Sequence, residues 1–319
     1  AVGNSALATN TTGDFNVAVG HLALTSNTTA NENIAVGQCA LHATTTGHSN
    51  VAMGSCALDT NTTGCYTVGI GHRALYSNTS GCYNTSIGMC SMYSNTSANN
   101  NSAFGVSAMR DNTTGAANVA MGYQSMMINT EGCQNTAIGS DSLRQNLTGD
   151  HNVAMGYNAG TSNTTGANNT FVGNFASHLN TTGSDNVSYG SQALYTATTA
   201  ASNTALGRQA MCKTTTGPSN TAVGAFALCA NTTGTENVAV GYHSLKLNTT
   251  ARRNTALGTS SLRDNTTGAC NTSVGFNNLV LNTTGVCNTS VGRAAMDANT
   301  TGDFNVAVGN NALSTNTTA

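Results

Sequence analysis

Charged residues are scarce in this chain of 319 residues: they make up 7% of it, and the formal net charge is -2. A surface that binds nucleic acid needs a basic stripe, and a polybasic membrane patch needs clustered lysine and arginine. No apolar run approaches the length that crosses a bilayer, and no charged-then-apolar leader opens the chain. The composition therefore argues against nucleic acid as a partner and against membrane insertion of this segment.

A convergent group of reactive residues is also lacking. The twelve acidic residues are dispersed, and the histidines are scattered in a way that builds no metal cage. Residues 69–74 match the dinucleotide fingerprint G-x-G-x-x-A, but we interpret the match as accidental, because Gly69 replaces the usual alanine of a repeat and no helix is expected to follow. We expect neither an enzyme nor a cofactor or metal site. The histidines, interpreted as solvated surface residues, are His21, His42, His48, His72, His151, His178 and His243.

What the chain does have is a strict repeat. A glycine recurs with a 17-residue period through 18 steps, without insertion or deletion, and such a fixed period decides the architecture before local propensity does. We count columns from this repeat glycine, so that column +4 is the fourth residue after it. The repeat glycines are Gly3, Gly20, Gly37, Gly54, Gly71, Gly88, Gly105, Gly122, Gly139, Gly156, Gly173, Gly190, Gly207, Gly224, Gly241, Gly258, Gly275, Gly292 and Gly309.

The unit reads N-[V/T]-[A/S]-[V/I/L/M]-G-x-x-[A/S]-[L/M]-x-x-N-T-T-[G/A]-x-x. The residue before the glycine is apolar, and column +4 is Leu or Met except at Gly160 and Ser177. We expect these invariant columns to build the structure. Columns +1, +2, +5, +11 and +12 vary freely and are expected to face outward.

The unit is a poor helix former, because glycine, asparagine and threonine favour turns and caps. Two β-sized stretches remain, one around N-[V/T]-A-V and one around A-L. Short strands, glycine turns and a strict short period predict an all-β parallel β-solenoid with one 17-residue repeat per coil and about 19 coils. With strands about 4.8 Å apart, the array would form a rod of roughly 85 Å.

The domain organisation follows from the same period. Residues 1–319 are expected to form one continuous repeat array. The chain starts and stops within a unit and has no polar cap sequence, whereas solenoids need atypical terminal repeats. We therefore interpret it as a fragment of a longer repetitive chain.

Eight of the ten cysteines form pairs at the 17-residue spacing of the repeat, in four different columns. Equal columns on neighbouring coils should lie about 4.8 Å apart, within the Cα separation that a disulfide accepts. The sequence predicts rung-to-rung disulfides, each contributing about 3 kcal/mol, and hence an oxidising extracellular or cell-surface location. The alternative is duplication of a unit that happened to contain cysteine. The pairs are Cys39 with Cys56, Cys65 with Cys82, Cys212 with Cys229, and Cys270 with Cys287; Cys90 and Cys133 are expected to be unpaired or to form interchain bonds.

The N-T-T segment allows two interpretations. It matches the acceptor pattern for N-glycosylation, and it is also good turn chemistry, since Asn and Thr side chains bond to nearby backbone. A glycan cannot be obligatory in every coil, because Glu131 spoils the pattern after Asn129, and Thr44, Ala197 and Thr214 replace the asparagine. The glycosylation candidates are Asn10, Asn27, Asn61, Asn78, Asn95, Asn112, Asn146, Asn163, Asn180, Asn231, Asn248, Asn265, Asn282, Asn299 and Asn316.

A second asparagine column stands four residues before the glycine and begins with Asn16, Asn33 and Asn50. Stacked amides in such a column are expected to hydrogen-bond to one another along the axis.

The segments NTSIG at 84–88, NSAFG at 101–105 and NTAVG at 220–224 resemble the N-S-x-A-I-G core of the head repeats of trimeric autotransporter adhesins. The resemblance covers a five-residue motif that recurs along the chain, within a longer unit. It implies a parallel β-roll filled by the small residue and the apolar residue before the glycine. It further implies that three chains pack side by side and that the heads bind host matrix or cells.

Three functions are consistent with these patterns. The first is a structural protein of an extracellular or cell-surface filament, a stiff rod that self-associates, is stapled by disulfides and can carry glycans. The second is an adhesin or receptor-binding fibre shaft that uses the variable columns, for example Tyr76 with Tyr93, or Phe175 and Phe226. The third is ice binding through threonine ladders, which is weakened because consecutive threonines of a strand point to opposite faces. A regular array without insertions favours the filament.

Overall fold

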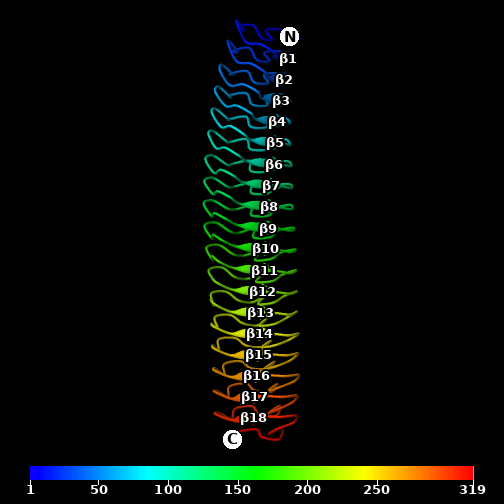
Figure 1. Ribbon diagram of the computed structural model, residues 1–319, viewed down its shortest axis with the longest axis vertical. Coiled ribbons are helices and arrows are strands. Elements are labelled where there is room, and N and C mark those ends of the chain that lie inside the picture. The colour runs from blue at the N-terminus through cyan, green and yellow to red at the C-terminus, as the bar shows by residue number, and fades with distance from the viewer. Residues whose placement is uncertain (319) are drawn as a thin grey trace. The chain divides into compact units, whose positions relative to one another are not determined.

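The computed structural model describes residues 1–318, and the chain divides into two compact units, Ala1–Thr165 and Gly166–Ala319. Each unit is a parallel β-solenoid with one 17-residue repeat per coil, as predicted, and the described residues contain no helix. Figure 1 shows the short strands of each unit following one another in chain order, one per coil.

Each strand is three residues long and ends immediately before a repeat glycine. The first unit contains β1 (Val17–Val19), β2 (Ile34–Val36), β3 (Val51–Met53), β4 (Val68–Ile70), β5 (Thr85–Ile87), β6 (Ser102–Phe104), β7 (Val119–Met121), β8 (Thr136–Ile138) and β9 (Val153–Met155). The second contains β10 (Thr170–Val172), β11 (Val187–Tyr189), β12 (Thr204–Leu206), β13 (Thr221–Val223), β14 (Val238–Val240), β15 (Thr255–Leu257), β16 (Thr272–Val274), β17 (Thr289–Val291) and β18 (Val306–Val308).

Within each unit, consecutive strands pair in parallel and in strict register. Ala18 of β1 is opposite Ala35 of β2, and Ala222 of β13 is opposite Ala239 of β14. Every residue therefore has its equivalent in the adjacent repeat as its neighbour in the next coil. The sequence period is converted into columns of equivalent side chains on each unit.

The prediction of a second strand around A-L is wrong. This segment forms turns, because columns +2 and +4 adopt left-handed backbone, as in Leu22 (φ 60°) and Leu24 (φ 51°). The turns still bond from coil to coil, since the N–H of Leu24 donates to the carbonyl of Ala40 over 3.1 Å. Left-handed residues reverse the chain tightly, which closes each coil within a single repeat.

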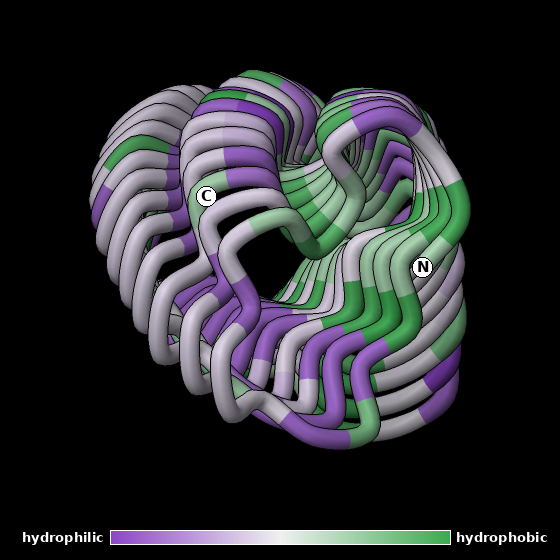
Figure 2. Tube along the Cα trace, turned by 90° about the horizontal axis from the view of Figure 1, so that it is seen from above, coloured by the Kyte–Doolittle hydropathy of each residue, from purple (hydrophilic) through white to green (hydrophobic). Residues whose placement is uncertain are grey.

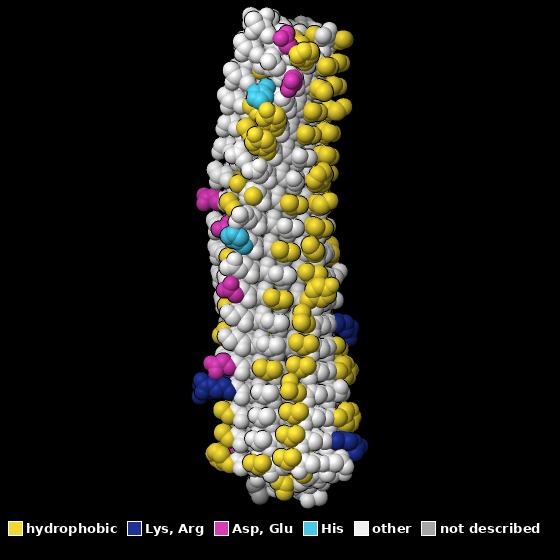
Figure 3. Space-filling model, in the orientation of Figure 1, with side chains coloured by type: hydrophobic (Ala, Val, Ile, Leu, Met, Phe, Trp, Pro, Cys, Tyr) yellow, Lys and Arg dark blue, Asp and Glu magenta, His cyan; other side chains and the backbone are white. Residues whose placement is uncertain are grey.

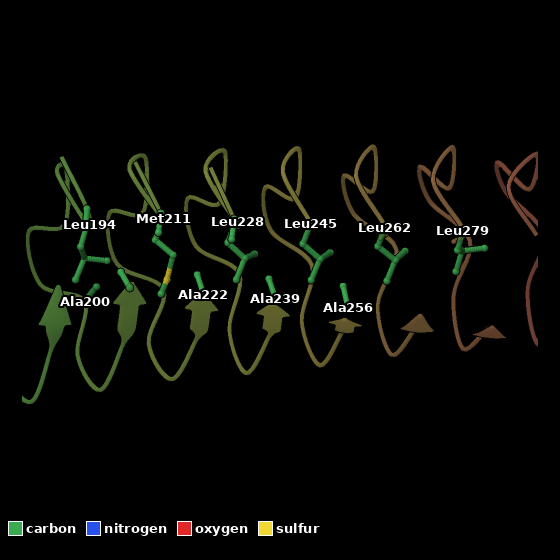
Figure 4. Close-up of a cluster of buried hydrophobic side chains, with 14 of the residues drawn as sticks. Leu194, Ala200, Met211, Ala222, Leu228, Ala239, Leu245, Ala256, Leu262 and Leu279 are labelled. Carbon is green, nitrogen blue, oxygen red and sulfur yellow. The ribbon is translucent and has the colours of Figure 1, made fainter. Parts of the chain in front are cut away.

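The core of each coil is narrow and consists of one large side chain and two small ones. In unit 2, the column +4 side chains from Leu194 to Met296 are fully buried opposite the small residues of column +15, and Figure 4 shows Leu228 and its neighbours facing Ala222, Ala239 and Ala256. Along the stack, hydrophobic segments recur at the same place in successive coils (Figure 2). In unit 2, Phe171 stands in the small-residue column and is the largest fully buried side chain.

The strand faces contradict the expectation that the small residue and the apolar residue before the glycine both fill the interior. The middle residue of each strand is buried, so the small-residue column lies inside the coil. The residue before the repeat glycine instead faces outward, as do Val19 and Met53. Columns +14 and +16, here called the strand stripe, therefore form a half-buried to exposed, uncharged band along each unit, apolar in column +16 and apolar or Thr/Ser in column +14. Figure 3 shows hydrophobic side chains lined up over successive coils in this way.

The repeat glycine has a steric cause. Gly71 has φ +131°, which side chains rarely adopt, and a Cβ placed on it would lie 2.5 Å from the carbonyl oxygen of Gly88. The other repeat glycines share this backbone conformation. Adjacent coils approach too closely at this column for any side chain.

Candidate functional site

The predicted cysteine pairs lie side by side on neighbouring coils. In unit 2, the Sγ atoms of Cys212 and Cys229 are 2.7 Å apart. In unit 1, the backbone N–H of Cys65 donates to Sγ of Cys82 over 3.1 Å. The thiols of the remaining two pairs are also close enough to perturb each other: Cys39 with Cys56, and Cys270 with Cys287.

All ten cysteines are thiols in the structure, so disulfide formation stays a prediction that the side-by-side placement supports. Cys90 and Cys133 are half-buried. The Sγ of Cys133 accepts a hydrogen bond from the backbone N–H of Ala116 over 3.3 Å. Their partners, within or between chains, also stay a prediction.

The Cys212 and Cys229 pair is electrostatically asymmetric. A hydrogen bond with Cys212, together with the nearby Lys213 and Lys246, lowers the pKa of Cys229 to about 7. The same hydrogen bond and burial raise the pKa of Cys212. Burial likewise raises the pKa of Cys39, Cys65 and Cys287. Cys229 is therefore the thiol best prepared to react as a thiolate.

The glycosylation candidates lie inside the coil. Apart from Asn10 and Asn316, they are fully buried. At Asn112, Nδ2 donates to Oδ1 of Asn95 and to the carbonyl of Gly115, both over 3.0 Å, and Oδ1 accepts from Nδ2 of Asn129 at 2.7 Å. A sugar on a buried Nδ2 would require the coil to open. Glycosylation stays a prediction, with solvent access only at the two partly exposed candidates.

The amide-to-amide ladder is thus found mainly in the N-T-T column. In the second asparagine column, Oδ1 of Asn33 instead accepts the backbone N–H of Asn50 over 3.0 Å, and Nδ2 of Asn33 donates to the carbonyl of Gly47 over 2.9 Å. Direct amide contacts also occur there, as between Asn135 and Asn118 at 3.2 Å. Both columns consist of structural side chains that tie adjacent coils together.

The threonines of N-T-T also serve the coil. The hydroxyl of Thr79 donates to the carbonyl of Thr96 over 3.0 Å, and this bond recurs in column +8. The side chains of column +9, such as Thr63, are exposed. Ice binding stays a prediction.

The variable columns face outward, as predicted, except at the buried Met127 and Thr161 of column +5, and several carry stacked rings. Tyr76 and Tyr93 stack with centroids 5.1 Å apart. Phe175 and Phe226 lie in separate groups, because Phe175 packs on His178 and Phe226 packs on His243. Three histidines interpreted as simply solvated, among them His48 on Tyr66, therefore pack against aromatic rings.

Within residues 1–318, no three His, Cys, Asp or Glu side chains gather closely enough to hold a metal ion. Gly69 and Gly71, of the accidental dinucleotide match, lie in and immediately after β4, and turns follow them. The described residues also contain no helix with the length and hydropathy to span a membrane.

Comparisons with known proteins give no family for the chain: no protein-family model matches it, and no similar curated protein was found. Its function therefore has to be inferred from the coil surface.

Two features of that surface were not predicted from the sequence. The first is the strand stripe. The second is a cavity of about 330 Å³ in unit 1, whose lining includes Glu32, His48 and Tyr66. The spacing of Tyr66 and Tyr83, which equals one repeat, was a signal for the stacking of their rings beside the cavity, because equal columns stack.

Proposed function

We propose that the chain is a non-enzymatic structural protein of an extracellular or cell-surface filament, and that it self-associates laterally through the strand stripe. The stripe is the observation that carries the proposal. In unit 1, column +16 holds only apolar residues: Val19, Val36, Met53, Ile70, Ile87, Phe104, Met121, Ile138 and Met155.

A stripe of this kind is costly to leave in water. Met53, Met121 and Met155 are 40–44% exposed, and large contiguous apolar patches on soluble proteins mark interaction sites. The band carries no charge in either unit, so no like-charge repulsion opposes its covering. Two copies share the same coil spacing. The side chains of one stripe can therefore pack between the side chains of the other in every coil. The resemblance to side-by-side β-roll chains points to the same kind of assembly.

The paired cysteines support the extracellular part of the proposal. In an oxidising compartment, each pair would lose two protons and two electrons to an oxidant and form a bond between adjacent coils. Each bond closes a loop of about 17 residues and adds about 3 kcal/mol by restricting the unfolded chain. Such staples suit a filament that must persist outside the cell.

Cryo-electron microscopy of the native material tests the filament. Continuous filaments with an axial repeat of about 4.8 Å are expected. Short discrete rods that end in a separate domain would favour an adhesin or receptor-binding shaft instead. The exposed aromatic rings of Phe15, Tyr66 and Tyr83 are the observation that favours this alternative. A particle without the axial repeat would refute both.

A pair of variants tests the stripe. Met121→Lys places a charge in the stripe, and Gln145→Lys places the same charge at an exposed position outside it. Sedimentation is expected to show self-association of the wild type and Gln145→Lys, and its loss in Met121→Lys. Equal behaviour of the two variants would show that the stripe is not the contact.

A further inference from the structure

The cavity of about 330 Å³ on unit 1 has the composition of a ligand site. It lies beside columns +9 to +12 of neighbouring coils, and Asn31, Glu32, Thr46, His48 and Tyr66 line it. None of its lining residues is lysine or arginine. A site with a carboxylate and no cation disfavours phosphate, sulfate and acidic sugars as ligands.

Tyr66, in one wall of this site, belongs to a stack of two tyrosine rings, here called the platform. The rings of Tyr66 and Tyr83 are 5.2 Å apart and within 5° of parallel. They are 51% and 59% exposed. The ring of His48, from the preceding coil, meets Tyr66 edge-on, with centroids 5.0 Å apart, so Tyr66 lies between His48 and Tyr83 and keeps about half of its side chain in contact with solvent.

The backbone holds the platform in place before any ligand arrives. Tyr66 and Tyr83 have left-handed backbone, with φ 55° and 59°, which turns column +12 outward. The N–H of Tyr66 donates to the carbonyl of His48, and that of Tyr83 to the carbonyl of Cys65, both over 3.1 Å. A rigid aromatic side chain gives contact area at low entropic cost.

The polar groups are fixed as well. Oε2 of Glu32 accepts a hydrogen bond from Oγ of Ser49 over 2.8 Å, and Nδ1 of His48 lies 3.3 Å from the same hydroxyl. Oδ1 of Asn31 accepts the backbone N–H of Asp14 over 2.8 Å, which turns its Nδ2 donor toward other partners. Glu32 Oε1, Asn31 Nδ2 and the hydroxyl of Thr46 thus offer both acceptors and donors.

We propose that this site binds a neutral saccharide, with a sugar ring packed against the exposed part of Tyr66 and its hydroxyls hydrogen-bonded to Glu32 and Asn31. Glu32 and Tyr66 stand two coils apart, roughly 10 Å along the column, which leaves room for a sugar ring between them. The C–H face of a pyranose is apolar and flat, and an aromatic face covers it. Its hydroxyls both donate and accept, as the opposite wall requires. The proposal goes beyond the filament and does not depend on self-association.

The test uses the full chain and an array of neutral and acidic oligosaccharides, followed by titration calorimetry with the best neutral ligand. The expected result is binding of neutral oligosaccharides alone. Tyr66→Ala and Glu32→Gln are each expected to weaken it about tenfold or more, the loss of one good contact. Tyr66→Phe keeps the platform and is expected to bind nearly as well as the wild type.

Tyr76→Ala is the matched control, because Tyr76 stacks on Tyr93 with centroids 5.1 Å apart, as Tyr66 does on Tyr83, but lies in column +5 and does not line the cavity. Its binding should equal that of the wild type. Circular dichroism verifies that each variant is folded. The proposal is overturned by three results: no neutral oligosaccharide bound at millimolar concentration, preference for acidic sugars, or equal loss of binding in Tyr76→Ala and Tyr66→Ala.

Discussion

At the scale of single residues, the coil depends on backbone conformations that most side chains avoid. Columns +2, +4 and +12 are left-handed in coil after coil, although most of their residues are not glycine. Such residues each cost of order 1–3 kcal/mol and persist only when the surroundings hold them. Here the hydrogen bonds to the coils on both sides hold them.

Gly71 and Gly69 give a matched test of this backbone argument. Gly71→Ala should lower the free energy of unfolding by about 3 kcal/mol, since the residue needs φ +131° and has a carbonyl in the way. Gly69→Ala should cost far less, because alanine is usual in its column and its nearest obstacle is the Leu58 side chain, 3.2 Å from the added Cβ, which needs to move only slightly. Chemical denaturation of both variants measures the difference, and an equal loss would contradict the steric explanation.

Cys229 offers a second prediction at the residue scale. Its pKa is lowered to about 7, so its thiolate should predominate above that pH, and alkylation of the reduced chain should rise with a midpoint near pH 7. The pKa of Cys287 is raised above the ordinary value of 9.0, so the midpoint of its alkylation should lie above that pH. Mass spectrometry after brief iodoacetamide treatment reads both sites.

Cys212→Ser is the control for that prediction. The hydrogen bond with Cys212 is the largest cause of the lowered pKa of Cys229. In the variant, a serine hydroxyl replaces the Cys212 thiol as the donor of this bond. The midpoint should move in this variant, while the profile of Cys287 stays unchanged. Faster alkylation of Cys287 than of Cys229 at neutral pH in the wild type would count against the asymmetry of the pair.

At the scale of the element, the sequence predicts the coil well and its orientation poorly. The 17-residue period predicted the solenoid and the neighbours of each cysteine, because equal columns must stack. It could not say which face of a three-residue strand is inside, since alternation only separates column +15 from columns +14 and +16. The large Leu and Met side chains of column +4 already fill the narrow interior, so small residues such as Ala18 fit opposite them.

The asparagines show the same limit of sequence reasoning. The N-T-T pattern allowed both a surface acceptor and a turn residue, and a local pattern cannot reveal burial. Only the closed coil reveals that Asn112 has 0% exposure and bonds to the coils on either side. The platform of Tyr66 and Tyr83 could be suspected from spacing, but its neighbours Glu32 and Asn31 become relevant only when the turn geometry is known.

The ladder makes a prediction for the element. Asn112→Ala removes three side-chain hydrogen bonds and leaves the buried Nδ2 of Asn129 without its acceptor on Asn112. The expected loss is about 2–4 kcal/mol, since an unmet buried polar group costs about 1–3 kcal/mol by itself. Asn174→Ala, at an exposed position in column +1, should change stability by less than about 0.5 kcal/mol. Thermal unfolding distinguishes the two, and similar midpoints would mean that the ladder contributes little.

At the scale of the whole molecule, both units follow one rule: within each unit, a strand pairs only with the strands one repeat away. Stability in such arrays is a sum of coil terms and interface terms. A coil with neighbours on both sides has both of its interfaces, and a terminal coil has one. The ends of the chain should therefore open before its interior coils.

Hydrogen exchange on the polypeptide of residues 1–319 tests this last point. The N–H of Val119 in β7 donates to the carbonyl of Asn135 over 2.8 Å and lies among paired coils. In β18, at the end of the second unit, Val306 and Val308 are 69% and 71% exposed. Amides of β18 should exchange much faster than those of β7, because local opening there breaks a single interface. Uniform protection across all strands would instead indicate that the array opens as one cooperative unit, or that another copy covers its end.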